Sequence, residues 1–117
     1  MEKLFDGEYR LMEVLWEVQP INSTKLVRLC EERLNWNKST TYTVLRKLCQ
    51  KGAAKNEKAT VTALLSREEA IRAGGEELAG KAGGVAPFLT AFLSGRKLTM
   101  EEAMELKELI DRNMGGK

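Results

Sequence analysis

The chain has 117 residues, of which 43% are hydrophobic and 31% are charged, and its formal net charge is +2. This composition supports one domain with a packed core and excludes a mainly disordered chain, and no apolar run reaches the ~20 residues of a membrane-spanning helix. The lack of histidine removes the commonest general base and the commonest metal ligand. We therefore expect a soluble, cytoplasmic binding protein with no catalytic residue, no metal site and no cofactor.

Two amphipathic helices are predicted at the start of the chain. Residues 8–18 repeat apolar side chains every three or four positions, with Asp6 as the expected N-cap and Pro20 as the stop. Residues 22–24 (NST) offer capping side chains for a second helix, which runs to about residue 34.

A third helix is predicted over residues 39–51, opened by the polar residues 37–39. Gly52 follows at the position of a glycine that ends a helix. One side of this helix is apolar and faces inward. Its members are Thr41, Val44, Leu45 and Leu48.

After Gly52 the pattern changes from helical to extended. Residues 53–65 (AAKNEKATVTALL) are too short and too β-branched for a helix, and residues 56–58 (NEK) are typical of a turn between two short strands at 53–55 and 60–64. This pattern predicts a two-stranded hairpin.

Three more helices are predicted in the second half. A capping box at 66–69 (SREE) opens the first of them, the glycine pair at 74–75 weakens it, and the glycines within 80–84 end it. A short helix follows over 87–94, and a second capping box opens a helix over 99–113.

Three short helices followed by a hairpin are the layout of a winged helix-turn-helix. We therefore predict a mainly α (α+β) protein, with a winged helix DNA-binding domain over residues 1–65 and a helical dimerisation region over 66–117. Within 38–58 there are six basic residues and one acidic residue, and they coincide with the projecting helix and the hairpin. The candidate DNA-contacting residues are Lys38, Ser39, Thr40, Tyr42, Thr43, Arg46, Lys47 and Lys51 on the helix and Lys55 and Lys58 in the hairpin.

Two other interpretations of the basic segment remain open. The charges could be an ordinary solvated surface, or the winged helix could be an adaptor that docks on another protein. Dependence of affinity on salt separates DNA binding from apolar docking.

The last two helices carry more apolar side chains than short helices can bury alone. Because such side chains are costly to leave in water, we expect a homodimer through this region. An intramolecular three-helix cap is the alternative. The candidate dimerisation residues are Phe88, Leu89, Phe92, Leu93, Met100, Leu106, Leu109 and Ile110.

Several runs of the sequence resemble the penicillinase repressor family of bacterial regulators. They are LFDGEYRLMEVLWE, STKLV, WNKSTTYTVLRKLCQKG and LLSREEA, and the resemblance covers residues 4–113. It implies a winged helix that binds inverted-repeat operator DNA, a homodimer formed by the C-terminal helices, and repression of resistance or stress genes such as those of copper homeostasis.

The resemblance also implies a release mechanism. The sequence departs from the family pattern at two places. In the penicillinase branch a signalling protease cuts the dimerisation region, and the matching step here is Ala91–Phe92. The wing is short and lacks an aromatic-rich second strand. Tyr42 stands where family members often carry a basic residue.

Overall fold

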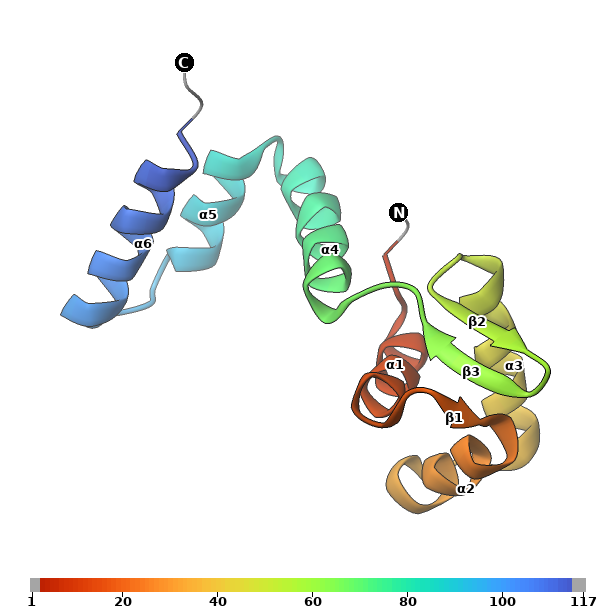
Figure 1. Ribbon diagram of the computed structural model, residues 1–117. Helices are drawn as coiled ribbons and strands as arrows, with labels where there is room; N and C mark the ends of the chain where they lie inside the picture. The colour runs from red at the N-terminus through yellow and green to blue at the C-terminus, as the bar shows by residue number, and fades with distance from the viewer. Residues whose placement is uncertain (1–2, 115–117) are drawn as a thin grey trace.

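The computed structural model describes residues 3–114, which form a mainly α-helical winged helix followed by a helical arm. In chain order the elements are α1 (Asp6–Val18), β1 (Ile21–Asn22), α2 (Ser23–Leu34), α3 (Lys38–Gln50), β2 (Ala54–Glu57), β3 (Thr60–Ala63), α4 (Arg67–Ala82), α5 (Val85–Leu93) and α6 (Met100–Arg112). Figure 1 shows α1–α3 and the sheet packed into one body, from which α4–α6 project. We call α4–α6 the arm. The predicted fold class is confirmed.

The hydrophobic core lies between α1, α2, α3 and the sheet. Fully buried side chains include Leu11 and Leu15 of α1, Leu26 of α2, Leu48 of α3 and Val61 of β3. Burial of each leucine side chain contributes roughly 1.5–3 kcal/mol, so the apolar stripes predicted in the sequence are what joins the three helices. The opposite face of α3 is left exposed.

Local capping signals set the limits of α2 and α3. The side chain of Asn37 accepts a hydrogen bond of 2.8 Å from the backbone N–H of Thr40, and Asn22 caps α2 in the same way. Gly52 ends α3 with a φ of +79°, a left-handed conformation that glycine adopts without strain. These three predicted boundary signals are confirmed.

The start of α1 differs from the prediction by one position. The N-cap is Phe5, and Asp6 is already helical. Phe5 has no side-chain oxygen that could cap the helix. The first turn is stabilised instead by a side chain inside the helix, because the carboxylate of Glu8 accepts a hydrogen bond of 2.8 Å from the backbone N–H of Phe5.

The sheet has three antiparallel strands in the order β1-β3-β2, of which β1 was not predicted. Ile21 of β1 pairs with Val61 of β3, and two residues are too few to show an alternating pattern. The hairpin turn lies at Lys58 and Ala59, not at 56–58. Both residues have positive φ (51° and 63°), which two-residue hairpin turns of type I′ require.

The glycines within 80–84 end α4 as predicted, but the end is at Gly83, which has a φ of +95°. The helix continues through Gly74, Gly75 and Gly80. The predicted capping boxes at Ser66 and Thr99 both form, and α6 therefore begins where it was expected. α5 begins at Val85, two residues earlier than predicted.

The arm makes the chain elongated. The radius of gyration is 17.9 Å, whereas a compact domain of this length has about 13 Å. Figure 1 shows α5 and α6 lying side by side, away from the winged helix. Neither of these two helices contains a buried residue.

Candidate nucleic-acid interface

One face of α3 is exposed along its whole length and carries cations and hydroxyls. It lies opposite the buried side chains of Thr41, Leu45 and Leu48, as the helical spacing of the sequence predicted. We call it the α3 face. Its members are Lys38, Ser39, Thr40, Thr43, Arg46 and Lys47. The hydroxyls lie toward the N-terminal half of the helix and two of the three cations lie toward the C-terminal half.

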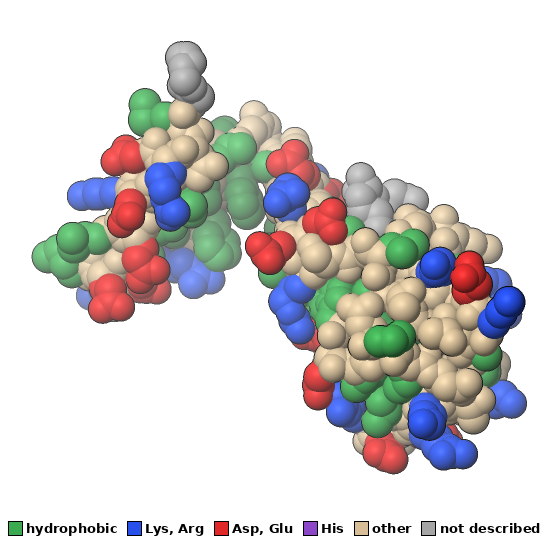
Figure 2. Space-filling view, viewed as in Figure 1, with side chains coloured by type: hydrophobic (Ala, Val, Ile, Leu, Met, Phe, Trp, Pro, Cys, Tyr) green, Lys and Arg blue, Asp and Glu red, His purple; other side chains and the backbone are tan. Residues whose placement is uncertain are grey.

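The hairpin brings two further lysines to the surface. Lys55 on β2 and Lys58 in the turn are both exposed, and the Nζ of Lys55 lies 4.0 Å from the carboxylate of Glu57. The backbone N–H of Ser23 donates a hydrogen bond of 2.8 Å to the carbonyl of Ala59, so the tip of the hairpin is tied to the start of α2. Basic side chains are distributed along the outer edge of the winged helix in Figure 2.

Tyr42 differs from its predicted neighbours on α3. Its ring is half-buried and packs against the core, and its hydroxyl donates a hydrogen bond of 3.4 Å to the Oγ of Ser23. The ring therefore joins α3 to α2. Ser23 also holds the hairpin tip, so Tyr42 positions the α3 face with respect to the hairpin. The ring of Tyr42 does not project from the α3 face.

Lys51 is engaged in a largely buried ion pair and does not project from the α3 face. Its Nζ lies 2.6 Å from Oε1 of Glu8, and the two side chains are only 12% and 4% exposed. The ammonium also lies 4.2 Å from the centre of the Phe5 ring. The sequence placed Lys51 with the exposed cations of the helix, and the structure instead pairs it with Glu8. The cause of this difference is a partner 43 positions away, which the spacing along the helix could not show.

The candidate dimerisation residues lie on α5 and α6 and are separated into two groups. Between the two helices there is an apolar groove of about 640 Å³. The candidates that line it are Leu89, Phe92, Leu93, Leu106, Leu109 and Ile110. Phe88 stacks on Phe92 with ring centres 5.9 Å apart, and Met100 is exposed at the start of α6.

A second apolar stripe, on α4, was missed in the sequence. Ile71 and Leu78 are 58% and 51% exposed, and Leu64 before the helix and Val85 after it are exposed as well. Ile71 and Leu78 are seven positions apart on α4 and therefore share one side of the helix, whereas Leu64 and Val85 lie outside α4. Apolar residues seven positions apart are typical of a helix that pairs with another helix, and this spacing was the signal that could have identified the stripe of Ile71 and Leu78.

Residues 3–114 contain no group of three His, Cys, Asp or Glu side chains that could hold a metal ion. No helix within the same residues has both the length and the apolar character needed to cross a membrane. The surfaces with a defined chemistry are the basic α3 face with its hairpin and the apolar faces of the arm.

Comparison with known proteins agrees with this architecture. The sequence model of the penicillinase repressor family matches residues 5–112, a range that includes both the winged helix and the arm. The chain is also 28% identical over 112 residues to a protein of Latilactobacillus sakei described as an uncharacterized 16.5 kDa protein in the ptsI 3′ region. That alignment covers 89% of this chain and 75% of the relative. The resemblance found in the sequence is thereby confirmed, and the chain belongs to the penicillinase repressor family of transcriptional regulators.

Proposed function

We propose that this protein is a transcriptional repressor that binds inverted-repeat operator DNA as a homodimer in the bacterial cytoplasm. The observation that carries the proposal is the α3 face, where three cations and three hydroxyls project from one helix whose other side is buried. The major groove of B-form DNA is wide enough to admit such a helix. Membership of a family of transcriptional repressors supports the same function.

Each part of the surface has a separate role in this proposal. Ser39, Thr40 and Thr43 contact base edges, because hydroxyls donate and accept hydrogen bonds there. The cations contact phosphates, which position the protein on the duplex. The phosphate-contacting residues are Lys38, Arg46 and Lys47 on α3 and Lys55 and Lys58 on the hairpin.

The homodimer forms through the arm. In a single chain the apolar groove between α5 and α6 and the stripe on α4 face water, and an apolar surface of this kind is typical of an interface. A two-fold dimer presents two α3 faces to two half-sites, so the operator is expected to have the symmetry of the protein.

Release of DNA follows from loss of the dimer. Ala91 and Phe92 are both exposed and lie within α5. Cleavage between them by a signalling protease would divide α5 and separate α6 from the rest of the arm. The α3 face would stay intact, but one α3 alone reads only one half-site. In this proposal the regulated genes are resistance or stress genes.

Fluorescence anisotropy tests the proposal directly. The full chain is titrated onto a duplex from its own promoter region and onto a random duplex of equal length, at two salt concentrations. We expect tighter binding to the promoter, with an affinity that falls by about 10³–10⁵-fold between 50 and 200 mM salt if six to ten phosphates are contacted. Lys97→Ala, at an exposed position between α5 and α6 that does not line the groove, is the control for removal of a charge far from the α3 face.

Two results would contradict DNA binding as the function. Equally weak binding to both duplexes would contradict recognition of an operator in the promoter region. Affinity that does not change with salt would instead favour an adaptor that docks on another protein through an apolar surface, since counterion release is absent from such contacts.

A further inference from the structure

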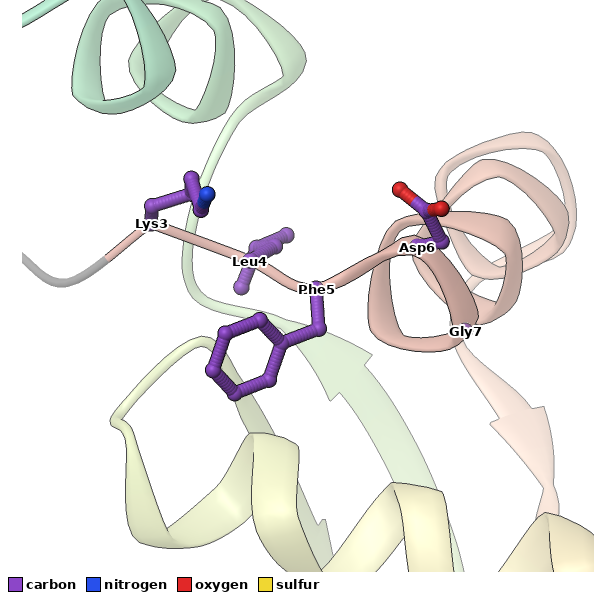
Figure 3. A pocket seen from close by; sticks show the side chains of 5 residues that line it. All are labelled: Lys3, Leu4, Phe5, Asp6 and Gly7. Carbon is purple, nitrogen blue, oxygen red and sulfur yellow. The ribbon is translucent and has the colours of Figure 1, made fainter. Parts of the chain in front are cut away.

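The segment before α1 lies between α3 and α4 and contacts both. We call Lys3, Leu4 and Phe5 the N-terminal strap. Figure 3 shows the side chain of Lys3 directed toward α4 and the ring of Phe5 directed toward the end of α3, on the other side of the backbone. Leu4 between them is buried. The strap therefore links the DNA-facing body to the first helix of the arm.

The attachment to α3 is buried and made of several contacts. The ammonium of Lys51, just after α3, donates a hydrogen bond of 3.0 Å to the carbonyl of Lys3 and pairs with Glu8 at 2.6 Å. Glu8 in turn accepts the backbone N–H of Phe5 at 2.8 Å. Because these charges are nearly excluded from water, they have no alternative partners of equal quality. The position of the strap relative to α3 is thus strongly determined.

The attachment to α4 includes an ion pair, and its place along the helix matters. The Nζ of Lys3 lies 2.9 Å from Oε1 of Glu77. The hydrogen bond from Lys3, more than any other contact, lowers the pKa of the Glu77 carboxyl. An exposed ion pair contributes little free energy. Glu77, however, is ten positions after the start of α4, which is about 15 Å along the axis.

Because of that distance, the ion pair restrains the angle of α4 more than a contact near the first turn would. Within residues 3–114 the other ion pair between α4 and the winged helix is at the first turn of α4, where Arg67 lies 3.6 Å from Glu13 and Ala70 is buried nearby. Contacts at one end of a helix leave it free to pivot. A second contact two to three turns away restricts the pivot even when it is weak.

From this geometry we infer that the N-terminal strap sets the angle between α4 and the winged helix, and thereby the separation of the two α3 helices in the dimer. Lys3 and Glu77 are positioning residues that determine which spacing of half-sites is bound. The inference rests on the proposed function, because spacing has a meaning only for a dimer on DNA.

The first experiment measures the angle without DNA. Nitroxide labels are placed at Arg28→Cys on α2 and Ala82→Cys at the end of α4, both exposed positions, in a chain whose native cysteines are replaced by alanine. The labelled full-length chain is mixed with excess unlabelled chain, so that pulsed electron spin resonance reports the distance within one protomer. We expect Lys3→Glu to shift and broaden this distance distribution. The swap Lys3→Glu/Glu77→Lys should restore it.

The control is Lys81→Glu. Lys81 also contacts Glu77, at 3.5 Å, but from within α4. This variant places the same new negative charge beside Glu77 without altering the strap, so the distance distribution should stay that of the wild type.

The second experiment measures spacing on DNA. The two halves of a bound promoter fragment are moved together or apart by single base pairs, and affinity is measured for each duplex and for one isolated half-site. We expect Lys3→Glu to lose the wild-type preference for one spacing while its affinity for the isolated half-site is unchanged, and the charge swap to restore the preference.

Each outcome decides the inference. A distance distribution and a spacing preference that both remain as in the wild type would overturn it. A shifted distance with an unchanged spacing preference would overturn it as well, because the angle would then not control the operator. If the wild type binds no DNA, the proposed function fails, and an unshifted distance distribution would still overturn the role of the strap in setting the angle.

Discussion

The indole N–H of Trp16 on α1 donates a hydrogen bond of 2.7 Å to the backbone carbonyl of Leu65, 49 positions away in the sequence. Leu65 is buried and immediately precedes the capping residue of α4. The guanidinium of Arg67 lies over the same indole, 4.8 Å from the ring centre. Trp16 therefore anchors the point where the arm leaves the winged helix.

Replacement of Trp16 by phenylalanine keeps a large ring but leaves the carbonyl of Leu65 without its donor. We expect the free energy of unfolding to fall by about 1–3 kcal/mol, which is the cost of a buried group left unpaired. Urea denaturation followed by circular dichroism measures this. Trp36→Phe is the control, because the indole of Trp36 makes no hydrogen bond within residues 3–114 and should lose less. Equal losses would argue against a special role for the bond.

Removal of one member of the Glu8–Lys51 pair leaves a buried charge. Lys51→Met should therefore lower the free energy of unfolding by about 3–5 kcal/mol, and Glu8→Gln/Lys51→Met should recover part of that loss. Lys47→Met on the exposed α3 face is the matched control, with an expected change within about 0.5 kcal/mol. If the double variant bound DNA with a weaker salt dependence than the wild type, Lys51 would have to be counted among the residues that contact phosphates.

Two substitutions on the α3 face separate base contact from phosphate contact. Thr43→Ala should weaken operator binding by about 2 kcal/mol, because each of the two protomers loses one hydrogen bond of about 1 kcal/mol, and it should not change the salt dependence. Lys47→Ala should reduce the slope of log affinity against log salt by about 1.8, because each protomer loses one phosphate contact worth about 0.9. Circular dichroism checks that both variants are folded. Unchanged affinity in both would move the DNA surface away from α3.

A charge in the α5–α6 groove should prevent the dimer. Phe92 is 51% exposed and lines the groove with Ile110, so Phe92→Asp and Ile110→Asp place a carboxylate at the proposed interface. We expect sedimentation velocity to show monomers at micromolar concentration, with weak operator binding. Glu101→Gln, at an exposed position of α6 outside the groove, should remain dimeric. Dimers that persist in both aspartate variants would place the interface elsewhere.

The two cysteines should be slow to react and should respond to alkaline pH. Burial raises the pKa of both the Cys30 and the Cys49 thiols, an effect that a hydrogen bond with Thr41 partly offsets at Cys30. Alkylation of the folded protein at pH 8 is expected to be slower than that of an unfolded control. Folding favours the protonated thiols, so the free energy of unfolding should be highest below the ordinary thiol pKa and should fall as pH rises through the raised one. Cys30→Ala/Cys49→Ala should weaken this alkaline decrease.

Sequence reasoning succeeded wherever the signal and its structural effect lie a few residues apart. Asn37, Ser66 and Thr99 were predicted to cap helices, and each accepts a backbone hydrogen bond within three positions. It failed at Asp6, where the side chain of Glu8 stabilises the helix start in place of an N-cap oxygen, and at β1, whose two residues are a strand only because β3 pairs with them.

The sequence by itself determined the helices, the hairpin, the inward face of α3 and the family, because these depend on the period of apolar residues and on local capping. Only the tertiary structure decided that Lys51 is buried against Glu8, that Tyr42 packs toward Ser23, and that α5 and α6 lie away from the winged helix. The physical reason is that these features depend on contacts between residues 19 or more positions apart, or on the lack of such contacts. A side chain on an exposed face of a single helix has the same spacing whether it meets DNA, water or a buried partner from elsewhere in the chain.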